Sequence, residues 1–260
     1  MKKWALVTGS TSGIGKSFSV LLASEGYNLV TVARNQNQLK FDAESLQKRF
    51  GIEVLIKSAD LSSAIDISSL AAFIQDTHLD IQVLVNNAGF GINSNFMESE
   101  IKNESSLVNC MILAPLELTH AVGKRMRKSS AGYIINVSSV AGYMAGSTYC
   151  SAKAWLNIFS ESLHKEFKNY GINVHVVCPG FTRTDFHNRC KQDVSGVPNY
   201  FWLKADEVAT QAWRDVRRGK AMSIPKIHYK ILVAIHQYAP RSAVRVYATI
   251  AKAFLQRNNR

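Results

Sequence analysis

The length, composition and charge of the chain exclude several classes of protein. It has 260 residues, of which 47% are hydrophobic and 19% charged, and it contains only five prolines. This composition is typical of a globular protein and excludes a disordered, collagenous or coiled-coil chain. The longest strictly apolar run near the C-terminus covers residues 231–235, far fewer than the roughly 20 residues that a membrane-spanning helix needs. We therefore expect a chain that does not span a bilayer.

The net charge of +12 is distributed unevenly along the chain. Residues 201–260 hold 12 lysines and arginines but only three acidic residues, so nine of the twelve net charges lie in this part. No zinc-finger, RNA-recognition or basic-zipper pattern accompanies these charges. We therefore predict no nucleic-acid partner and treat residues 201–260 as an electrostatically separate region.

The cysteines and histidines predict neither a disulfide framework nor a metal site. No two cysteines form a Cys-x-x-Cys pair, and the seven histidines have no metal-ligand spacing. The apolar stretch after Lys2 and Lys3 is interrupted at residues 8–10, too early for the core of a signal peptide. We therefore predict a cytoplasmic protein in a reducing compartment, with no bound metal.

Short β-branched runs alternate with segments long enough to form helices. The first predicted helix covers residues 14–25 and stops at Gly26, and another covers 63–76 and begins with Ser63 and Asp66 as a variant capping box. Alternation of this kind predicts right-handed βαβ crossovers. The fold class is therefore α/β, with a doubly wound, mostly parallel sheet flanked by helices. The predicted strands cover residues 5–8, 28–33, 53–58, 83–86, 133–137 and 173–178.

The C-terminal region continues this pattern and then changes. Residues 206–220 are predicted to form a helix and residues 221–225 a last strand. From Ser242 onward the sequence predicts a basic amphipathic helix, which can lie on an anionic membrane surface, cover a sheet edge or pack on a dimer partner. Its apolar face holds Val244, Tyr247, Ile250, Ala251, Phe254 and Leu255, and its basic face Arg241, Arg245 and Lys252.

The loop between the first strand and the first helix has the composition of a phosphate-binding site. Backbone N–H groups and the positive end of the helix favour an anion there, and glycines allow a tight turn and the close approach of a pyrophosphate. A tight turn with an N-cap serine is the purely structural alternative. The loop residues that we expect at a cofactor are Gly9, Ser10, Ser12, Gly13, Ile14 and Gly15.

Arg34 ends the second predicted strand, the position that distinguishes NAD from NADP. A carboxylate there binds the ribose hydroxyls of NAD, whereas an arginine accommodates the 2′-phosphate of NADP. No acidic residue stands at this position, and Arg34 can pair bidentately with a phosphate. We predict NADP(H), with a solvated surface arginine as the alternative.

Two tyrosine–lysine pairs have the spacing of one helical turn. A lysine four residues after a tyrosine lies on the same helical face, where its ammonium group favours the phenolate and lowers the tyrosine pKa. Tyr149 and Lys153 follow a strand and a serine doublet and open a long amphipathic pattern. Tyr200 and Lys204 follow Pro198 and lead into the basic region. This context favours Tyr149 and Lys153 as the catalytic pair.

The ordered set of motifs resembles the short-chain dehydrogenase/reductase family in its NADP-preferring branch. The resemblance implies a Rossmann-type domain that moves a hydride between nicotinamide and a carbonyl or alcohol carbon. We assign this domain to residues 1–200, with a substrate lid at 186–200, followed by a basic helical extension at 201–260. The motifs are Thr8-Gly9-x-x-x-Gly13-x-Gly15, Asp60-Leu61, Asn86-Asn87-Ala88-Gly89, Asn109, Ser139, Tyr149-x-x-x-Lys153 and Pro179-Gly180-x-x-x-Thr184.

The resemblance also implies a role for each catalytic position. Tyr149 is expected to protonate the carbonyl oxygen, Lys153 to lower the tyrosine pKa and hold the nicotinamide ribose, and Ser139 to orient the substrate. Asn109 is expected to position a water in the proton relay. The remaining expected cofactor contacts are Asp60, Leu61, Asn87, Ala88, Gly89, Pro179, Gly180, Thr182 and Thr184, with a helix-start cap as the alternative role of Asp60.

The chain departs from the family pattern in one loop. Ser139 precedes Tyr149 by ten residues, whereas members of the family commonly have about three more. The shortening is expected to alter the pocket mouth and leaves the placement of Ser139 open. We predict an apolar pocket, with ordinary core packing as the alternative, lined by Phe90, Tyr143, Met144, Cys150 and Phe181.

Three functions from different classes follow from these observations. The first is an NADP(H)-dependent reductase that acts on a small apolar carbonyl compound, such as a 3-oxoacyl chain or a steroid-like ketone. The second is an NADP(H)-binding module without catalysis. The third is a membrane-surface protein that acts through its basic tail. The family resemblance implies a homodimer or homotetramer, and residues 226–260 are the expected peripheral membrane contact.

Overall fold

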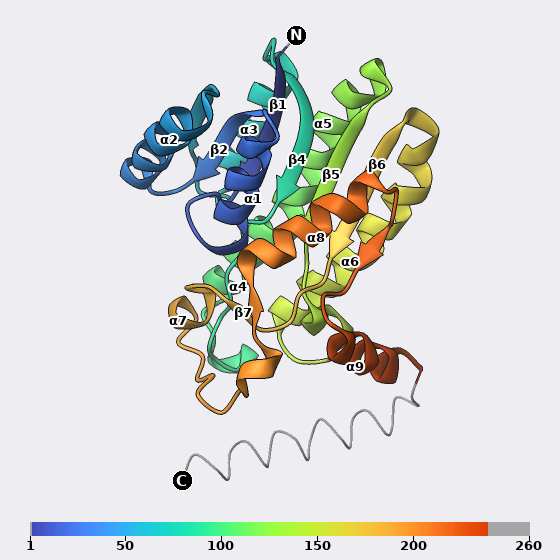
Figure 1. Cartoon of the computed structure of the whole chain (residues 1–260). Helices are drawn as coiled ribbons and strands as arrows, with labels where there is room; N and C mark the ends of the chain where they lie inside the picture. Colours follow the sequence, from blue (N-terminus) through green and yellow to red (C-terminus); the bar gives the residue numbers. More distant parts are fainter. Residues whose placement is uncertain (1, 239–260) are drawn as a thin grey trace.

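The structure, a computed structural model, describes residues 2–238 and is built on a seven-stranded parallel sheet (Figure 1). The strand order is β3-β2-β1-β4-β5-β6-β9, so the chain reverses direction across the sheet between β1 and β4. This order confirms the predicted doubly wound α/β class. The strands are β1 (Lys3–Thr8), β2 (Asn28–Ala33), β3 (Val54–Ser58), β4 (Asp80–Asn86), β5 (Gly132–Val137), β6 (Ile172–Val177) and β9 (Met222–Ser223).

Helices cover both faces of the sheet because side chains alternate along each strand. On β1, Trp4 and Leu6 belong to one buried cluster, and Ala5 and Val7 to the other. The first cluster is covered by α3 (Ala64–Asp76), α5 (Ala114–Ser129) and α6 (Thr148–Phe167). The second is covered by α1 (Gly13–Ser24), α2 (Gln36–Phe50) and α8 (Ala205–Arg217).

The predicted helix ends depend on local capping. Gly26 follows α1 in the left-handed region at φ +84°, as its predicted terminal position requires. Ser63 caps α3 by accepting from the Asp66 N–H at 3.4 Å. The Asp66 carboxylate accepts from the Asp60 N–H at 2.7 Å. In a capping box it would instead return to the N-cap residue itself, so this carboxylate ties the preceding turn to the helix.

Residues 201–238 continue the fold without a break in the described chain. The two-residue strands β7 (Thr182–Arg183) and β8 (Leu203–Lys204) pair in parallel as a separate small sheet. After them α8 packs on α1 and on the sheet, and β9 pairs with β6 as its edge strand. The final described helix, α9, covers Ile227–Tyr238. The amphipathic helix predicted from Ser242 onward lies outside the described residues.

One continuous helical stretch is long and apolar enough to cross a membrane by composition alone. It runs over Ile101–Ser129, and 56% of its most apolar window is buried in the protein. This stretch joins α4 (Ile101–Val108) to α5 through a π-helical turn, Asn109–Leu113. Because α5 contacts α3 and the sheet strand β4, its burial is that of a core helix.

Candidate active site

The predicted cofactor residues gather at the carboxyl ends of β1 and β4. In open α/β sheets, ligands bind at the point where the strand order reverses. Here that point lies between β1, which leads into the glycine loop, and β4, which leads into Asn87. The predicted loop therefore lies where the strand order reverses, the place at which sheets of this kind bind ligands.

Close backbone contacts explain why the loop needs its glycines. Gly9 has φ +64°, and Gly13 has φ +53°. A Cβ atom on Gly15 would lie 2.2 Å from the Gly9 carbonyl oxygen, so only glycine allows α1 to start this close to β1. The Asn87 amide donates to the carbonyl oxygens of Thr8 at 2.9 Å and Gly9 at 3.2 Å. These bonds join the loop to the end of β4.

The N-terminus of α1 keeps the features of an anion site. Ser12 is the N-cap residue but makes no side-chain capping bond, and the first turn contains no acidic residue. Ser10 instead binds β2, because its N–H and hydroxyl both donate to the Val32 carbonyl oxygen at 3.3 and 3.4 Å. Ile14 packs its side chain against the core, which leaves its backbone as the group that can face a ligand.

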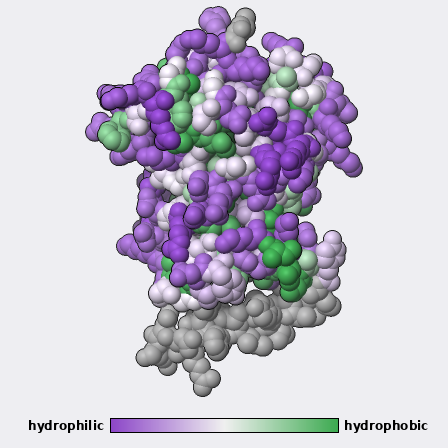
Figure 2. All heavy atoms as spheres, in the orientation of Figure 1, coloured by the Kyte–Doolittle hydropathy of each residue, from purple (hydrophilic) through white to green (hydrophobic). Residues whose placement is uncertain are grey.

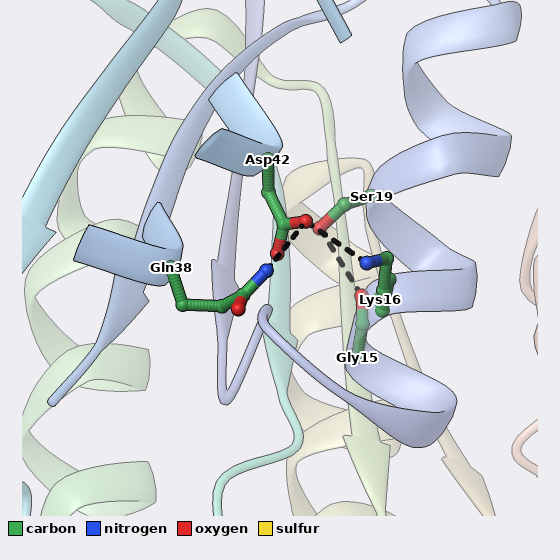
Figure 3. Close-up of polar contacts among 5 residues, drawn as sticks. All are labelled: Gly15, Lys16, Ser19, Gln38 and Asp42. Carbon is green, nitrogen blue, oxygen red and sulfur yellow. Dashed lines mark hydrogen bonds and ion pairs between the residues drawn. The ribbon is translucent and has the colours of Figure 1, made fainter. Parts of the chain in front are cut away.

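Two cations lie near this loop, and they differ in their partners. Lys16 binds the Asp42 carboxylate at 2.9 Å, and Gln38 donates to the same oxygen at 3.1 Å (Figure 3). Arg34 is exposed at the end of β2 and forms no ion pair with any described residue. Arg34 is therefore the cation of the two that remains available to a phosphate.

Asp60 and Asn109 meet at the turn before α3. The Asp60 carboxylate accepts from the Ser62 N–H at 3.0 Å and from the Ser62 hydroxyl at 2.8 Å. Asn109 donates to the Ser62 carbonyl oxygen at 2.9 Å from the π-helical turn, a kind of turn that is frequent at functional sites. Leu61 is 5% exposed in the core, so its side chain is not available to a ligand.

A chain of buried amides stiffens the centre of the sheet. Asn86 donates to Asn136 at 2.8 Å and to Thr119 at 3.0 Å. Asn136 donates in turn to the Ser160 hydroxyl of α6 at 2.8 Å. These bonds fix α6, which carries Tyr149, against β4 and β5.

Ser139, Tyr149 and Lys153 come together at the carboxyl end of β5 and the start of α6. The Ser139 hydroxyl donates to the Pro179 carbonyl oxygen at 3.4 Å and lies close enough to Tyr149 to influence its pKa. The Lys153 ammonium group donates to the Val137 carbonyl oxygen at 2.7 Å and lies 5.7 Å from the centre of the Tyr149 ring. The shortened loop therefore still places Ser139 beside the tyrosine.

Burial controls the protonation of this pair. It raises the pKa of Tyr149, and the nearby Ser139 hydroxyl only partly opposes this shift. Burial also lowers the pKa of Lys153 to about 8. Lys153 was expected to lower the pKa of Tyr149, and this expectation is wrong for the present arrangement. The Lys153 ammonium group binds the Val137 carbonyl oxygen, and the loss of water around the tyrosine hydroxyl has the larger effect on its pKa. Tyr149 is thus a fully protonated acid at neutral pH.

The predicted lid, residues 186–200, covers Tyr149. It lies between β7 and β8 and contains the short helix α7 (Phe186–Arg189). The Phe186 ring lies 5.6 Å from the Tyr149 ring, centre to centre. The Cys190 thiol accepts from the Gly91 N–H at 3.1 Å. These contacts bring the lid against Tyr149 and against the loop that follows β4.

The segment that leads into the lid reaches the glycine loop. Thr184 lies so close to Gly13 that a Cβ atom there would be 2.9 Å from the threonine methyl group. Thr182 donates to the Gly180 carbonyl oxygen at 3.0 Å. The Pro179 carbonyl oxygen accepts from the Val140 N–H at 3.0 Å. Thr184 therefore lies beside the glycine loop and Pro179 beside Ser139, while Gly180 lies against the ring of Tyr229 on α9.

A small cavity of about 20 Å³, enough for one water-sized group, adjoins Tyr149. None of the five residues predicted to line the substrate pocket borders this cavity. The difference arises because Tyr143 turns away and binds the Met222 sulfur at 2.9 Å, while Phe90 packs on the core. The wall is half polar and is formed by Ile92, Ser94, Phe96, Glu104, Leu107, Ser147, Thr148 and Tyr149.

Comparison with known proteins decides the family. Residues 3–195 match the family model described as short chain dehydrogenase. The chain belongs to the short-chain dehydrogenase family. This is the family that the motifs implied. Among the described residues, no group of three or more His, Cys, Asp or Glu side chains could hold a metal ion.

Two curated relatives of this short-chain dehydrogenase are ketoacyl reductases by name. The very-long-chain 3-oxoacyl-CoA reductase of Rattus norvegicus is 33% identical over 189 residues, which cover 70% of this chain and 60% of that protein. The ketoacyl reductase HetN of a Nostoc species is 32% identical and is matched over 69% of this chain and 63% of that protein. The chain thus spans about three fifths of the length of these relatives.

Solved structures resemble this short-chain dehydrogenase over nearly its whole length. A short-chain dehydrogenase from Sphingobium yanoikuyae in complex with NADPH is 29% identical, with a TM-score of 0.83 over 96% of this chain and 95% of that one. A 7β-hydroxysteroid dehydrogenase reaches a TM-score of 0.84 over 94% of this chain and 96% of that one. Its identity of 21% supports the fold alone.

The second tyrosine–lysine pair of this short-chain dehydrogenase is not a site. Tyr200 is 62% exposed in a 3-10 turn, and Lys204 ends β8, so the two do not share a helix. Sequence reasoning predicted the lid that carries Phe186 and Cys190, but it did not single out these two residues or Glu104 as neighbours of Tyr149. No local pattern marks them, because they meet the tyrosine only through the folding of distant segments.

Proposed function

We propose that the protein reduces the ketone of a 3-oxoacyl or similar lipid-like compound, with NADPH as the hydride donor. The observation that carries this proposal is the meeting of Ser139, Tyr149 and Lys153 at the carboxyl end of β5. The two ketoacyl reductases among the relatives support the substrate class. The NADPH complex of the Sphingobium dehydrogenase supports the cofactor.

Three features of the described residues fit a dinucleotide phosphate. The glycine loop allows the close approach of a pyrophosphate, the uncapped start of α1 offers its N–H groups, and Arg34 is free to bind a 2′-phosphate. When bound, the nicotinamide supplies a hydride to the carbonyl carbon. The Ser12 hydroxyl, which makes no capping bond, would contact the phosphates, and Asp60 would hold the adenine end, while the Ser10 side chain is engaged with β2.

The protein's own residues supply the proton. Tyr149 donates its phenolic proton to the carbonyl oxygen while the hydride reaches the carbon, so the ketone becomes a secondary alcohol and the tyrosine a phenolate. Ser139 donates a hydrogen bond to the same oxygen. The Lys153 ammonium group stabilises the phenolate, which regains its proton from solvent through a water that Asn109 positions. Because burial raises the pKa of Tyr149, the phenolate needs this positive charge.

The lid excludes water from this reaction. Phe186 lies against Tyr149, and Cys190 ties the lid to the loop after β4. A site without bulk water strengthens the hydrogen bonds to the carbonyl oxygen and prevents loss of the hydride. The apolar ring of Phe186 also matches a lipid-like substrate.

Steady-state kinetics with a 3-oxoacyl thioester and NADPH test this function. Tyr149→Phe removes the acid and is expected to lower kcat by at least 100-fold while NADPH binding is retained. Tyr143→Phe is the matched control, because its hydroxyl binds Met222, and it is expected to keep most of the activity. An active Tyr149→Phe enzyme would contradict the assigned acid. A wild type that binds NADPH but reduces no ketone would favour the binding module without catalysis.

We also propose that the protein is a homodimer or homotetramer. The outer face of α6 is apolar, with Ile158 65% exposed and Trp155 stacked on Phe159 at 4.5 Å. An apolar strip of this kind is typical of a contact between subunits. Light scattering is expected to show an oligomer that Ile158→Glu reduces to smaller species, and an unchanged mass would contradict this interface.

We further propose that the protein is cytoplasmic and contacts a membrane peripherally through residues 226–260. Ile227, Ile231 and Ile235 are 68%, 55% and 53% exposed at four-residue spacing on α9, and Figure 2 shows an apolar patch over this helix. The sequence after Asp215 contains no acidic residue, which suits an anionic surface. Ile231→Glu is expected to abolish flotation with anionic liposomes, with Ile158→Glu as the control. Equal flotation of both would contradict this contact.

A further inference from the structure

Glu104 is a buried carboxylate without a partner. It lies in the first turn of α4 and is only 7% exposed. Its Oε2 atom is buried and has no hydrogen-bond partner among the described residues, and the side chain forms no ion pair there. Buried carboxylates are almost always paired, because removing their charge from water is costly. Its position therefore needs an explanation.

The carboxylate borders the same cavity as the catalytic tyrosine. The wall of this cavity includes both Glu104 and Tyr149. Phe96, Ile92 and Leu107 supply its apolar part, while Ser147 and Thr148 add hydroxyl groups at the start of α6. The cavity has room for one small group, so a hydroxyl or N–H group of a ligand that reaches Tyr149 fits in the space bordered by Glu104.

A purely structural role explains the position poorly. An acidic residue in the first helical turn interacts favourably with the helix dipole. An exposed side chain provides the same interaction without the cost of removing its carboxylate from water. Glu100, the N-cap residue of α4, is exposed and makes no capping bond. Polar groups that are buried without a partner destabilise a fold and are retained where a ligand completes them.

We propose that Glu104 accepts a hydrogen bond from the substrate and selects carbonyl compounds that carry an O–H or N–H donor near the ketone. The inference rests on the proposed reductase function and adds a polar requirement to it. The donor group of the substrate provides the hydrogen bond that Oε2 lacks. A substrate without a donor leaves the carboxylate buried and unpaired, which is a strong basis for discrimination.

Matched substrate pairs test the proposal. One pair is a hydroxyketone and its O-methyl ether, and the other is a 3-oxoacyl N-acetylcysteamine thioester and its N-methylated amide. The wild type is expected to prefer the donor-bearing member of at least one pair by about 10-fold or more in kcat/KM. The pair that shows the preference identifies whether the donor is a hydroxyl or an amide.

The variants at Glu104 locate the preference. Glu104→Leu is expected to bring the ratio within each pair to about one, and Glu104→Gln, which keeps an acceptor oxygen, to leave an intermediate ratio. Glu100→Gln is the control on the same helix and is expected to retain the wild-type ratio. A preference that survives in Glu104→Leu, or a wild type with no preference in either pair, would overturn the proposal.

A second measurement separates this inference from the reductase function. Calorimetric binding of the same compounds to the NADP⁺ complex reports the preference even if no ketone is reduced, so a silent enzyme refutes the function without deciding the role of Glu104. Thermal unfolding gives a further check. Glu104→Leu is expected to raise Tm by a few degrees, because it removes an unpaired buried charge. A lower Tm would identify Glu104 as a structural residue.

Discussion

Replacing Tyr229 with phenylalanine removes the hydroxyl group that joins the two ends of the lid. Tyr229 lies on α9 and is 2% exposed. Its Oη atom accepts from the Phe181 N–H at 2.9 Å, beside β7, and donates to the Phe201 carbonyl oxygen at 2.8 Å, beside β8. Its ring covers Gly180, where a Cβ atom would lie 1.9 Å from the ring carbon Cζ. Phenylalanine keeps the ring contact and loses both hydrogen bonds.

The magnitude follows from these two bonds. Each hydrogen bond contributes about 0.5–1.5 kcal/mol net, so the variant is expected to lose about 1–3 kcal/mol in the free energy of unfolding. For a protein of this size, each kcal/mol lowers Tm by roughly 2–4 °C. Because both lost bonds hold the lid, amide hydrogen exchange is expected to accelerate at Phe181 and across residues 186–200. The KM for the ketone is expected to rise as the closed lid becomes less populated.

Hydrogen exchange and calorimetry check this prediction. The control is Tyr238→Phe, which removes an 86% exposed hydroxyl from the same helix and is expected to change neither Tm nor exchange. If Tyr229→Phe exchanged at Phe181 and in the lid at the wild-type rate, the proposed tie between α9 and the lid would be refuted. A loss of Tm with unchanged lid exchange would assign Tyr229 to general core packing.

Three further perturbations follow from the site. Arg34→Ala is expected to weaken NADPH binding at least 10-fold and leave NADH binding unchanged in fluorescence titrations; an equal loss for both would remove Arg34 from the 2′-phosphate site. Burial lowers the pKa of Lys153 to about 8, so kcat/KM for reduction should fall as pH rises above about 8. Between about pH 8 and the ordinary lysine pKa the unfolded chain binds more protons than the folded one, so the free energy of unfolding of the wild type should rise with pH relative to that of Lys153→Met. Parallel pH dependences of the wild type and Lys153→Met would contradict this prediction. Gly15→Ala should lower the free energy of unfolding by about 1–3 kcal/mol through overpacking against Gly9, and NADPH binding should be lost. A variant that denatures like the wild type would show that the loop can relax.

The sequence was sufficient for the sheet because its strands are continuous β-branched runs. The prediction at residues 83–86 found only the end of β4, which begins at Asp80, since Asp80 and Gln82 interrupt the apolar run. Of the strand predicted at residues 221–225, only two residues form a strand in the structure, as β9. The paired strands β7 and β8 are too short for any periodic pattern, and their pairing depends on contacts across the lid.

The site was predictable where spacing along the chain fixes geometry. The glycine loop and the Tyr149–Lys153 pair lie within single turns, so their residue types and spacing suffice. The direction of the Tyr149 pKa shift was not predictable, because it depends on burial beneath Phe186, a residue 37 positions away. The polar character of the cavity was hidden for the same reason, since Glu104 reaches it from a separate helix.

Transfer of deuterium from NADPH to a ketone tests the central claim most directly. A 3-oxoacyl thioester is incubated with NADPH that carries deuterium at nicotinamide C4 on either face, and the alcohol is analysed by mass spectrometry and NMR. The account predicts one deuterium at the carbinol carbon from one face of the cofactor, with at least a 100-fold slower transfer in Tyr149→Phe. An alcohol without deuterium, or equal rates in the wild type and Tyr149→Phe, would contradict the account.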